Sequence, residues 1–356
     1  MNRMNECPIC GSKALVPFLK RERVPVHQNI VIRDQRSAVE TPCDDLTLAV
    51  CEECGFVFNQ SFNPAKLRYG ETYDNTQTCS AAFEEYLDEL AQHMTGEKGV
   101  SNCRVVEVGC GKGLFLRKLV EPSDLGNVGH GFDPSYVGQP TDLDGRLSFE
   151  RRYFDSTCHD ATADVIVCRH VIEHVPEPLT LLRAVRRAVA DSPRAQVFFE
   201  TPCIEWILTN QVLWDFFYEH CSYFTAQSLT TAFELSGFQV NGVRHVFGGQ
   251  YLWLEATLSQ GHRTIAKNPG AVPALARTFA AAESGLKSSY ENMLRTLTEK
   301  GPGKVALWGA GAKGVTFANL VDPCRRWIAC IVDLNPAKQG SFLPGTGHPV
   351  VSYTQL

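Results

Sequence analysis

The sequence lacks three features that would assign the chain to a broad class at once. It has almost no excess of charge, since 34 lysine and arginine residues stand against 39 aspartate and glutamate residues. The resulting net charge of −5 gives no electrostatic basis for binding nucleic acid or an anionic membrane. No apolar run is long enough to cross a bilayer, and the N-terminus lacks the apolar region of a signal peptide. We therefore expect a soluble, cytoplasmic protein with neither nucleic acid nor membrane as a partner.

Cysteines with an organised spacing are also few. Most of the 14 cysteines are scattered singly, as reduced core thiols often are. Four form two Cys-x-x-Cys pairs, each followed by glycine: Cys7, Cys10, Cys51 and Cys54. Each pair can present two thiolates to one tetrahedral ion, so we predict a structural zinc site with no open position for catalysis. The alternative is a redox dithiol, which would need a thioredoxin-like context that residues 11–50 do not offer.

The most informative segment spans residues 104–116, where a buried-strand pattern leads into a glycine-rich turn that opens a helix. A dinucleotide fingerprint, GxGxxG, would place its third glycine at Leu114, and this mismatch argues against NAD. The residues resemble motif I of the class I S-adenosylmethionine methyltransferases, in which an acidic residue ends the first strand beside the positively charged sulfonium. The predicted cofactor residues in this turn are Glu107, Gly109, Gly111 and Gly113. A nicotinamide or flavin cofactor, or a turn without a ligand, remains as the alternative.

Strand and helix patterns alternate through the middle of the chain. We predict strands at 104–108, 128–133, 152–155, 163–168 and 196–200, with apolar strands returning at an antiparallel edge in 238–258. Such alternation is typical of a parallel α/β sheet.

Several polar residues fall where cofactors bind in such sheets, at the carboxyl ends of the strands. Asp133 follows Gly113 by about 20 residues and is expected to accept hydrogen bonds from ribose hydroxyls. Asp155 is a candidate for the adenine amino group, and His170 for the wall of the cofactor cleft. The alternative for each is an ordinary turn residue.

A second glycine turn, at residues 305–314, follows a long predicted helix. Its Gly309, Gly311 and Lys313 could cradle a pyrophosphate at a helix N-terminus, and Asp333 could take a ribose hydroxyl. We prefer a nucleotide-linked sugar here, with NAD or a turn without a ligand as alternatives. Only residues 349–351 suggest a third strand, so we expect an incomplete Rossmann-like domain.

The cysteine pairs, both glycine turns and the segment Glu219–Phe224 together resemble the sugar C-methyltransferases of deoxysugar biosynthesis, along nearly the whole chain. The resemblance implies an α/β protein with three parts. These are a zinc-binding module (1–75), a methyltransferase domain with a class I Rossmann-like sheet (76–262) and a Rossmann-like substrate-binding domain (263–356). Members of that family continue beyond the position matching Leu356. They commonly read Tyr-His-Glu-His where this chain has residues 217–220, Phe-Tyr-Glu-His, so we expect a different acceptor.

The resemblance implies C-methylation of a nucleotide-linked keto sugar, a small-molecule acceptor, by way of an enolate. His220 is the implied base, because an imidazole with a pKa of about 6.5 accepts a proton at neutral pH. Glu219 is expected to orient that imidazole, and His174 to hydrogen-bond the enolate. Tyr73 and Tyr223 are candidates for closing the pocket or donating to the substrate, with plain packing as the alternative.

Two other functions stay open. One is O- or N-methylation of another small acceptor, with His220 deprotonating the acceptor. The other is a non-catalytic protein that binds S-adenosylmethionine, against which the intact Glu107, Asp133 and His220 count. We expect a monomer or a weak homo-oligomer.

Overall fold

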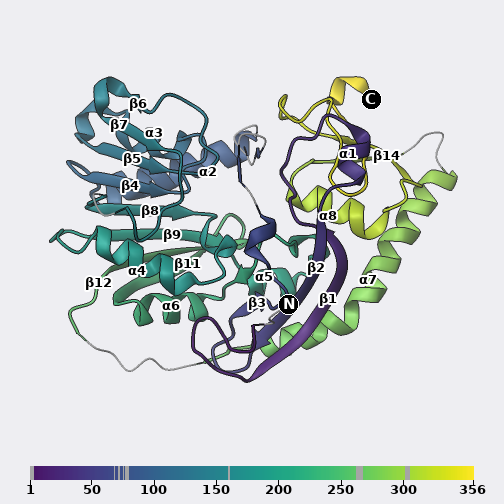
Figure 1. Ribbon diagram of the computed structural model, residues 1–356, viewed down its shortest axis with the longest axis horizontal. Coiled ribbons are helices and arrows are strands. Elements are labelled where there is room, and N and C mark those ends of the chain that lie inside the picture. Colours follow the sequence, from purple (N-terminus) through teal and green to yellow (C-terminus); the bar gives the residue numbers. More distant parts are fainter. Residues whose placement is uncertain are drawn as a thin grey trace.

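An eight-stranded sheet forms the largest layer of the protein (Figure 1). The computed structural model describes residues 4–67, 69–70, 73–74, 76, 80–158, 161–261, 268–300 and 305–356. The strands lie in the order β11-β12-β9-β8-β4-β5-β7-β6. In that order their bounds are Phe238–Val246, Tyr251–Leu258, Gln196–Pro202, Val165–Arg169, Arg104–Val108, Val128–Phe132, Leu147–Glu150 and Thr141–Asp142. The strands from β9 to β7 are parallel, and β12 pairs antiparallel with both β9 and β11. The predicted parallel sheet with an antiparallel edge at 238–258 is confirmed.

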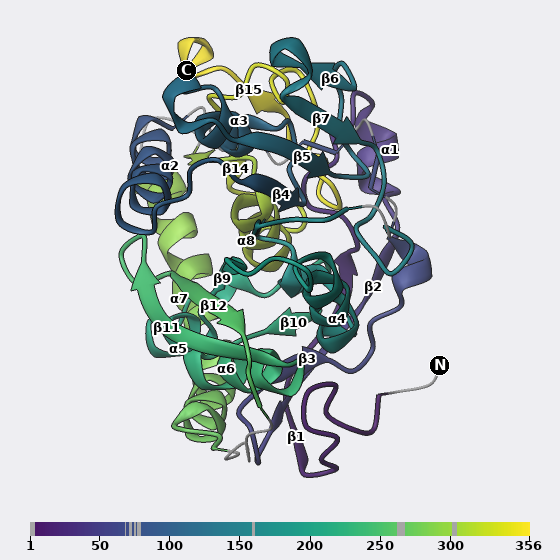
Figure 2. The ribbon, with the colours of Figure 1, turned by 90° about the vertical axis from the view of Figure 1, so that its left-hand side faces the viewer.

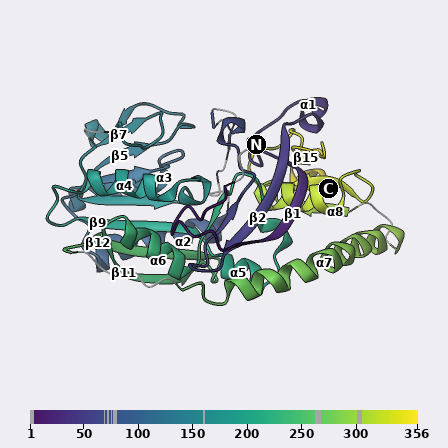
Figure 3. The same cartoon turned by 60° about the horizontal axis from the view of Figure 1, so that its bottom comes forward.

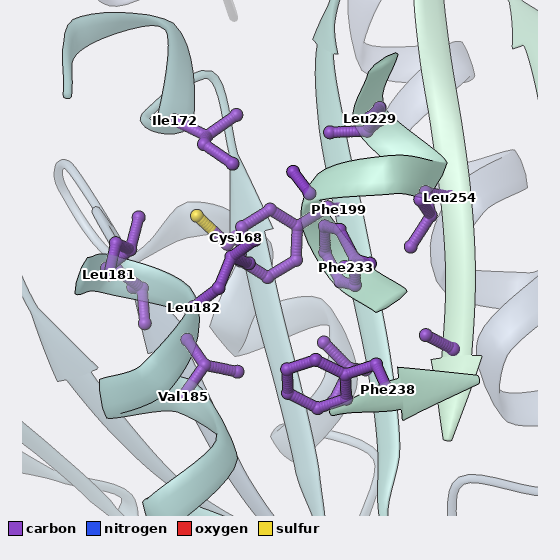
Figure 4. Close-up of a cluster of buried hydrophobic side chains, with 14 of the residues drawn as sticks. Cys168, Ile172, Leu181, Leu182, Val185, Phe199, Leu229, Phe233, Phe238 and Leu254 are labelled. Atoms are coloured by element: carbon purple, nitrogen blue, oxygen red, sulfur yellow. The ribbon is translucent and has the colours of Figure 1, made fainter. Parts of the chain in front are cut away.

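Helices cover both faces of this sheet. Successive side chains on a strand point to opposite faces, so Cys168 and Phe199 pack under α4 (Pro178–Ala188) and α6 (Ala226–Leu235), as Figure 4 shows. The neighbouring Val167 and Phe198 belong to the second core, under α2 (Ala81–Gln92) and α3 (Leu114–Val120). Because both faces are buried, the strands read as continuous apolar runs.

One predicted strand is misplaced. The third parallel strand is β7, at 147–150, and residues 152–155 form a loop after it. Strand β5 carries Gly129 and Gly131, and a Cβ at these positions would come within 3 Å of the side chains of Leu147 and Phe149. These glycines make room for the large side chains of β7, which explains why the strand lies there.

The N-terminal sheet has the order β1-β2-β3-β10 and is antiparallel throughout. The bounds are Leu15–Pro25, Cys43–Cys51, Val57–Asn59 and Ser222–Tyr223. Its last strand therefore comes from the middle of the chain and begins two residues after His220. The long helix α7 (Val272–Lys300) packs against β1 and β2, as Figures 1 and 3 show.

The C-terminal unit is a three-stranded parallel sheet, β13-β14-β15. Its elements are β13 (Val305–Trp308), α8 (Ala312–Val321), β14 (Ile328–Val332) and β15 (Val350–Val351). In Figure 2, where the large sheet is the part of the molecule nearest the viewer, α7 and α8 lie behind it. Of the residues at the predicted domain boundaries, 75, 262 and 263 lie outside the described residues. In the part of the chain that is described, no helix is long and apolar enough to span a membrane.

Candidate active site

A cavity of about 390 Å³ opens at the carboxyl ends of β4, β5 and β8. The strand order reverses between β4 and β8, and ligands bind in open α/β sheets at such a switch point. The cavity is lined by residues from the first glycine turn, from the end of β5, from the loop after β8 and from the segment before α2. Among the predicted site residues, its lining includes Glu107, Gly109, Gly111, Asp133, His170, His174 and Tyr73.

Two positions of the first glycine turn require glycine, each because a different neighbouring side chain leaves no room for a Cβ. Gly109 has a φ of 72°, and a Cβ there would lie 2.1 Å from Cγ2 of Val171. Gly113, with a φ of 75°, is the N-cap of α3, and a Cβ there would lie 2.5 Å from the Phe149 ring. Residues with a Cβ rarely adopt this backbone conformation, so glycine is the residue that lets the turn pass this close to its neighbours.

Two carboxyl groups already hold this turn in place. The buried Glu107 accepts a hydrogen bond from the Leu116 N–H (3.0 Å), and Asp133 accepts one from the Gly111 N–H (2.9 Å). Burial raises the pKa of the Glu107 carboxyl to about 8, although the charge of Arg169 and the hydrogen bond from Leu116 act in the opposite direction. A cation bound in the cavity would favour the ionised form of Glu107.

His170 and Arg169 form the wall of the cavity beyond β8. His170 has a φ of 54°, which is uncommon for a residue other than glycine, and its Nδ1 lies 3.3 Å from Glu173 Oε1. The Arg169 side chain donates to Glu200 (2.7 Å) and lies 4.6 Å over the Phe115 ring. Burial alone would raise the pKa of the Glu200 carboxyl, but the charges of Arg169 and His170 hold that pKa below its usual value. The wall on the cofactor side of the cavity thus contains a buried ion pair between Arg169 and Glu200.

The opposite wall holds aromatic and imidazole groups. The hydroxyl of Tyr69 lies 3.1 Å from Nδ1 of His174, and the rings of Tyr69 and Tyr73 meet edge to face at 4.9 Å. His174 ends a short 3₁₀ turn, Ile172–His174, that follows β8. Its ring centroid lies 4.7 Å from that of His220, at 89°.

His220 does not line the cavity itself, but is partly buried between two rings. Its ring contacts His174 on one side and Phe217, at 4.1 Å, on the other. Burial holds the pKa of the His220 imidazole well below its ordinary value, and the neighbouring His174 lowers that pKa further. The imidazole is therefore neutral at physiological pH and able to accept a proton.

Glu219 is fully buried, and its carboxylate differs from the prediction in its partners. Oε1 accepts the Gln28 N–H (2.6 Å) and Oε2 accepts the Tyr73 hydroxyl (2.8 Å). Nδ1 of His27 lies 3.4 Å from Oε1. Among the described residues, its hydrogen bonds thus do not go to His220, because the carboxylate points into the N-terminal unit. These hydrogen bonds fix the backbone next to His220 but do not reach its imidazole.

The four predicted metal ligands meet at one point of the N-terminal unit. The Sγ atoms of Cys7 and Cys54 lie 3.6 Å apart, as do those of Cys10 and Cys51, and all four lie within 4.8 Å of one another. A tetrahedral ion with metal–sulfur bonds of about 2.3 Å sets the sulfur atoms about 3.8 Å apart. The cluster therefore has the donors and spacing of a closed tetrahedral metal site.

Two family matches cover most of the chain. Residues 74–242 match a methyltransferase domain, and residues 271–356 match a C-methyltransferase C-terminal domain. The chain belongs to the S-adenosylmethionine-dependent methyltransferases.

Two curated relatives agree with this assignment. The methyltransferase is 24% identical to the C-methyltransferase NovU of Streptomyces niveus, over 99% of this chain and 86% of that relative. It is 30% identical to a ubiquinone biosynthesis O-methyltransferase of Escherichia coli O7:K1, over 33% of this chain and 47% of that relative. Among solved structures, the 1,6-didemethyltoxoflavin-N1-methyltransferase of Burkholderia thailandensis, with S-adenosylhomocysteine bound, matches with a TM-score of 0.40 and 14% identity. That match covers 51% of this chain and 82% of that chain.

The methyltransferase places two predicted site residues away from the cavity. Asp155 lies in the exposed loop after β7, where its carboxylate accepts the Thr157 N–H (2.8 Å), while Tyr153 and Phe154 line the cavity instead. Tyr223 is buried in β10, and its hydroxyl donates to the Phe217 carbonyl (3.4 Å). Asp155 misses the cavity because the strand ends earlier than predicted, and Tyr223 misses it because the strand turns this side chain into the core.

The second glycine turn also differs from the prediction. Asp333 accepts the Ala310 N–H (2.6 Å), as Asp133 does at the first turn, so Gly309 and Gly311 lie beside a carboxylate. Lys313, however, turns to the methyltransferase domain, where it pairs with Asp215 (3.1 Å) and donates to Gln250 (3.1 Å). Lys313 therefore links two units of the chain and does not lie over its own glycine turn.

Sequence reasoning missed several residues of the site. Tyr69 stands four residues before Tyr73 in the same segment, and Arg169 directly precedes His170 at a strand end, so both had a local signal. Gln28 had none, because its backbone N–H reaches Glu219 across the fold.

Proposed function

We propose that this methyltransferase C-methylates a nucleotide-linked keto sugar through an enolate formed by His220. The observation that carries the proposal is the position of His220, whose ring packs against His174, a residue of the cavity lining. A general base needs an unprotonated side chain within reach of the proton it removes. The match of residues 271–356 to a C-methyltransferase C-terminal domain supports transfer to carbon.

The cofactor fits the residues of the cavity. Glu107, Asp133, His170 and the backbone of the first glycine turn would hold S-adenosylmethionine, which when bound supplies an electrophilic methyl group. His220 takes the proton from the carbon next to the ketone. If the Tyr69 hydroxyl donates to Nδ1 of His174, the proton of His174 is on Nε2, and this N–H can stabilise the enolate oxygen.

The choice of a nucleotide-linked sugar rests on the family resemblance and on the second glycine turn. Asp333 and the backbone around Gly309 are the groups that would contact a nucleotide, at the N-terminus of α8. Lys313 could contact the same nucleotide only if it broke its ion pair with Asp215.

Zinc is the metal we propose for the four-cysteine cluster, because four thiolates in a closed tetrahedral set are typical of structural zinc. We also propose the cytoplasm, because most of the cysteines are scattered singly along the sequence, as reduced core thiols often are.

The test is a reaction of the protein with methyl-13C S-adenosylmethionine and a panel of nucleotide-linked keto sugars. NMR identifies the atom that carries the new methyl group, for wild type and for His220→Ala. We expect a methyl group on carbon, with the rate of the variant reduced by about 10²-fold or more, as for loss of a general base. Transfer to carbon at the wild-type rate in His220→Ala would exclude His220 as the base.

O-methylation is the second candidate, because the match to the ubiquinone biosynthesis O-methyltransferase covers 123 residues. His220 would then deprotonate a hydroxyl group. The same NMR experiment separates the two functions, since a methyl group on oxygen has a different carbon shift from one on carbon.

A further inference from the structure

A second cluster of metal-ligating side chains lies beside the cofactor cavity. Glu173 and His174 belong to the 3₁₀ turn after β8, and the ring of His220 packs against that of His174. One ligand atom of each of these three side chains lies within 4.8 Å of the other two. In the part of the chain that the structure describes, the other cluster of this kind is the four-cysteine cluster. The molecule thus gathers two sets of donors, one of thiolates and one of imidazoles with a carboxylate.

Glu173 is a buried carboxylate whose counter-charge is a histidine. The residue is only 1% exposed, and its Oε2 accepts the Thr201 hydroxyl (3.1 Å). Its ion pair among the described residues is with His170, whose Nδ1 lies 3.3 Å from Oε1. A histidine balances the carboxylate only when the imidazole is protonated. Because buried charges in proteins are paired or coordinate metals, a cation would be stabilised at this carboxylate.

The two imidazoles supply the other donors. The Tyr69 hydroxyl lies 3.1 Å from Nδ1 of His174, so His174 can donate its Nδ1 proton to Tyr69 and keep Nε2 unprotonated. A metal-bound histidine commonly hydrogen-bonds a second group through its other ring nitrogen, which fixes the orientation of the ring. His174 also lines the cavity, which gives an ion a path to the cluster.

The donor set selects the kind of ion. Two imidazoles and one carboxylate suit Zn²⁺, Co²⁺ and similar divalent cations, whereas Ca²⁺ and Mg²⁺ are held by oxygen ligands. With bonds of about 2.0–2.1 Å, a tetrahedral ion sets its donors about 3.4 Å apart. The donors of this cluster reach that spacing by approaching at most about 1.4 Å, a movement that rotation of the half-buried His174 ring can supply.

We propose that Glu173, His174 and His220 form a second metal site, for Zn²⁺ or a similar divalent cation, and that an ion bound there blocks methyl transfer. The block rests on the proposed role of His220 as the base, whereas the metal site itself does not. A general base takes a proton on the lone pair of an unprotonated nitrogen. An ion on the His220 imidazole occupies a lone pair of this kind, and an ion on His174 keeps that side chain from the enolate oxygen. The ion and the acceptor therefore compete for the same two imidazoles.

The sharpest variant is Glu173→Gln. It keeps the volume of the side chain and can still accept from Thr201, but it offers a neutral amide in place of the carboxylate. Loss of a partner outside the ligand shell already costs about 10- to 100-fold in metal affinity, so loss of a ligand should cost at least about tenfold. The matched control is Glu177→Gln, the same change four residues further on. Glu177 is exposed, and its Oε2 accepts the Thr180 hydroxyl (3.3 Å).

The first measurement is a titration of the full chain with Co²⁺, and it needs no acceptor. Co²⁺ bound to thiolates gives charge-transfer bands in the near ultraviolet, whereas Co²⁺ on imidazoles and a carboxylate gives visible bands alone. We expect wild type and Glu177→Gln to bind Co²⁺ with visible bands alone after the charge-transfer bands have saturated. Glu173→Gln and His174→Ala should bind this second ion at least about tenfold more weakly. Equal affinities of wild type and Glu173→Gln for this ion would overturn the site, even if His174→Ala fails to fold.

The second measurement uses the acceptor that wild type methylates with methyl-13C S-adenosylmethionine. We expect Zn²⁺, added beyond what the cysteine cluster holds, to lower kcat of wild type and Glu177→Gln by about 10²-fold or more at saturation, as for loss of a general base. A chelator too weak to strip four thiolates should restore kcat. Glu173→Gln should need at least about tenfold more Zn²⁺ for the same fractional loss.

The two measurements separate the site from its effect on activity. If Co²⁺ binds as expected but Zn²⁺ leaves kcat unchanged, the metal site stands and the role of His220 as the base fails. A rise of kcat on addition of Zn²⁺ would overturn the block, because the ion would then assist the acceptor. Equal inhibition of Glu173→Gln and Glu177→Gln by Zn²⁺ would mean that the inhibiting ion binds elsewhere.

Discussion

Glu107 is a buried carboxyl group whose charge depends on what the cavity holds. Its pKa of about 8 means that the free protein is largely protonated there at neutral pH. Binding of the positively charged cofactor favours the ionised form, so a proton must leave as the cofactor binds. We expect the affinity for S-adenosylmethionine to rise as the pH increases from 6 to 8, by at most about tenfold per unit, and then to level off.

Calorimetric titration of wild type and Glu107→Gln at several pH values checks this expectation. Ionisations of the ligand are common to both proteins, so the difference between their profiles belongs to Glu107. The variant should bind more weakly at pH 8, with a flatter profile. The same pKa predicts that the free wild type loses stability between about pH 4.5 and pH 8, because the unfolded chain releases this proton first. Parallel profiles for the two proteins would show that Glu107 does not exchange a proton on binding.

At the scale of single residues, the sequence predicts the position of a side chain best where its hydrogen-bond partners are close in the chain. Glu107 and Gly109 lie within one strand and its turn, so their spacing alone placed them in the cavity. The partners of Glu219 come from Gln28 and Tyr73, far away along the chain, and no local pattern shows that the carboxylate turns from His220. The direction of the Tyr223 side chain was hidden for a similar reason, since pairing of its strand with β3 sets the face on which it lies.

Strand β10 ties the proposed base to the cysteine cluster. It pairs with β3, which follows the second cysteine pair, and the Asn59 N–H donates to the Cys221 carbonyl (2.9 Å). We expect Cys51→Ser to release the proposed zinc, loosen β3 and reduce methyl transfer at least about tenfold, because a structural zinc would contribute directly to folding. The cavity residues lie on other elements, so cofactor affinity should stay within about twofold.

Metal analysis, thermal melting and calorimetry check this expectation, with Cys43→Ser as the control. Cys43 starts β2 on the same sheet, but its thiol donates to the Thr41 carbonyl and is outside the cluster. The control should keep the metal, the melting temperature and the activity. An equal loss of cofactor binding and of methyl transfer in Cys51→Ser would mean that the whole protein unfolds.

At the scale of elements, the sequence predicted the order of strands and helices but not every strand position. The sequence predicts a strand at residues 152–155, whereas the strand β7 is selected by the glycines of its neighbour β5. Such cross-strand fitting depends on which strands are adjacent. The same limit hides the pairing of β10 with β3, since a two-residue strand has no periodicity.

Helix α7 holds the three units of the molecule together. It packs with β1 and β2, with α5 (Ile204–Thr209) and with the core of the C-terminal unit. A partly buried polar contact joins this helix to β1: Arg21 donates to Glu283 (2.9 Å), and it also donates to the carbonyl of Phe216 (3.1 Å). The Arg21 side chain is 5% exposed and that of Glu283 is 25% exposed.

Removing one partner of this pair leaves a buried charge without its counter-ion. Burial lowers the pKa of Arg21, but the guanidinium remains charged. Glu283→Ala therefore leaves the Phe216 carbonyl as its hydrogen-bond acceptor among the described residues. We expect a loss of about 2 kcal/mol in the free energy of unfolding, below the 3–5 kcal/mol of fully buried pairs because Glu283 is partly exposed. The control is Arg277→Met. Arg277 lies on the same helix, and its exposed ion pair with Glu52 (3.7 Å) should contribute less than about 1 kcal/mol to the free energy of unfolding. Urea unfolding measures both, and the double variant Arg21→Met/Glu283→Met should recover part of the loss, since it removes the stranded charge. A double variant less stable than Glu283→Ala would show that the side chains contribute by packing α7 to β1 and not by their charge.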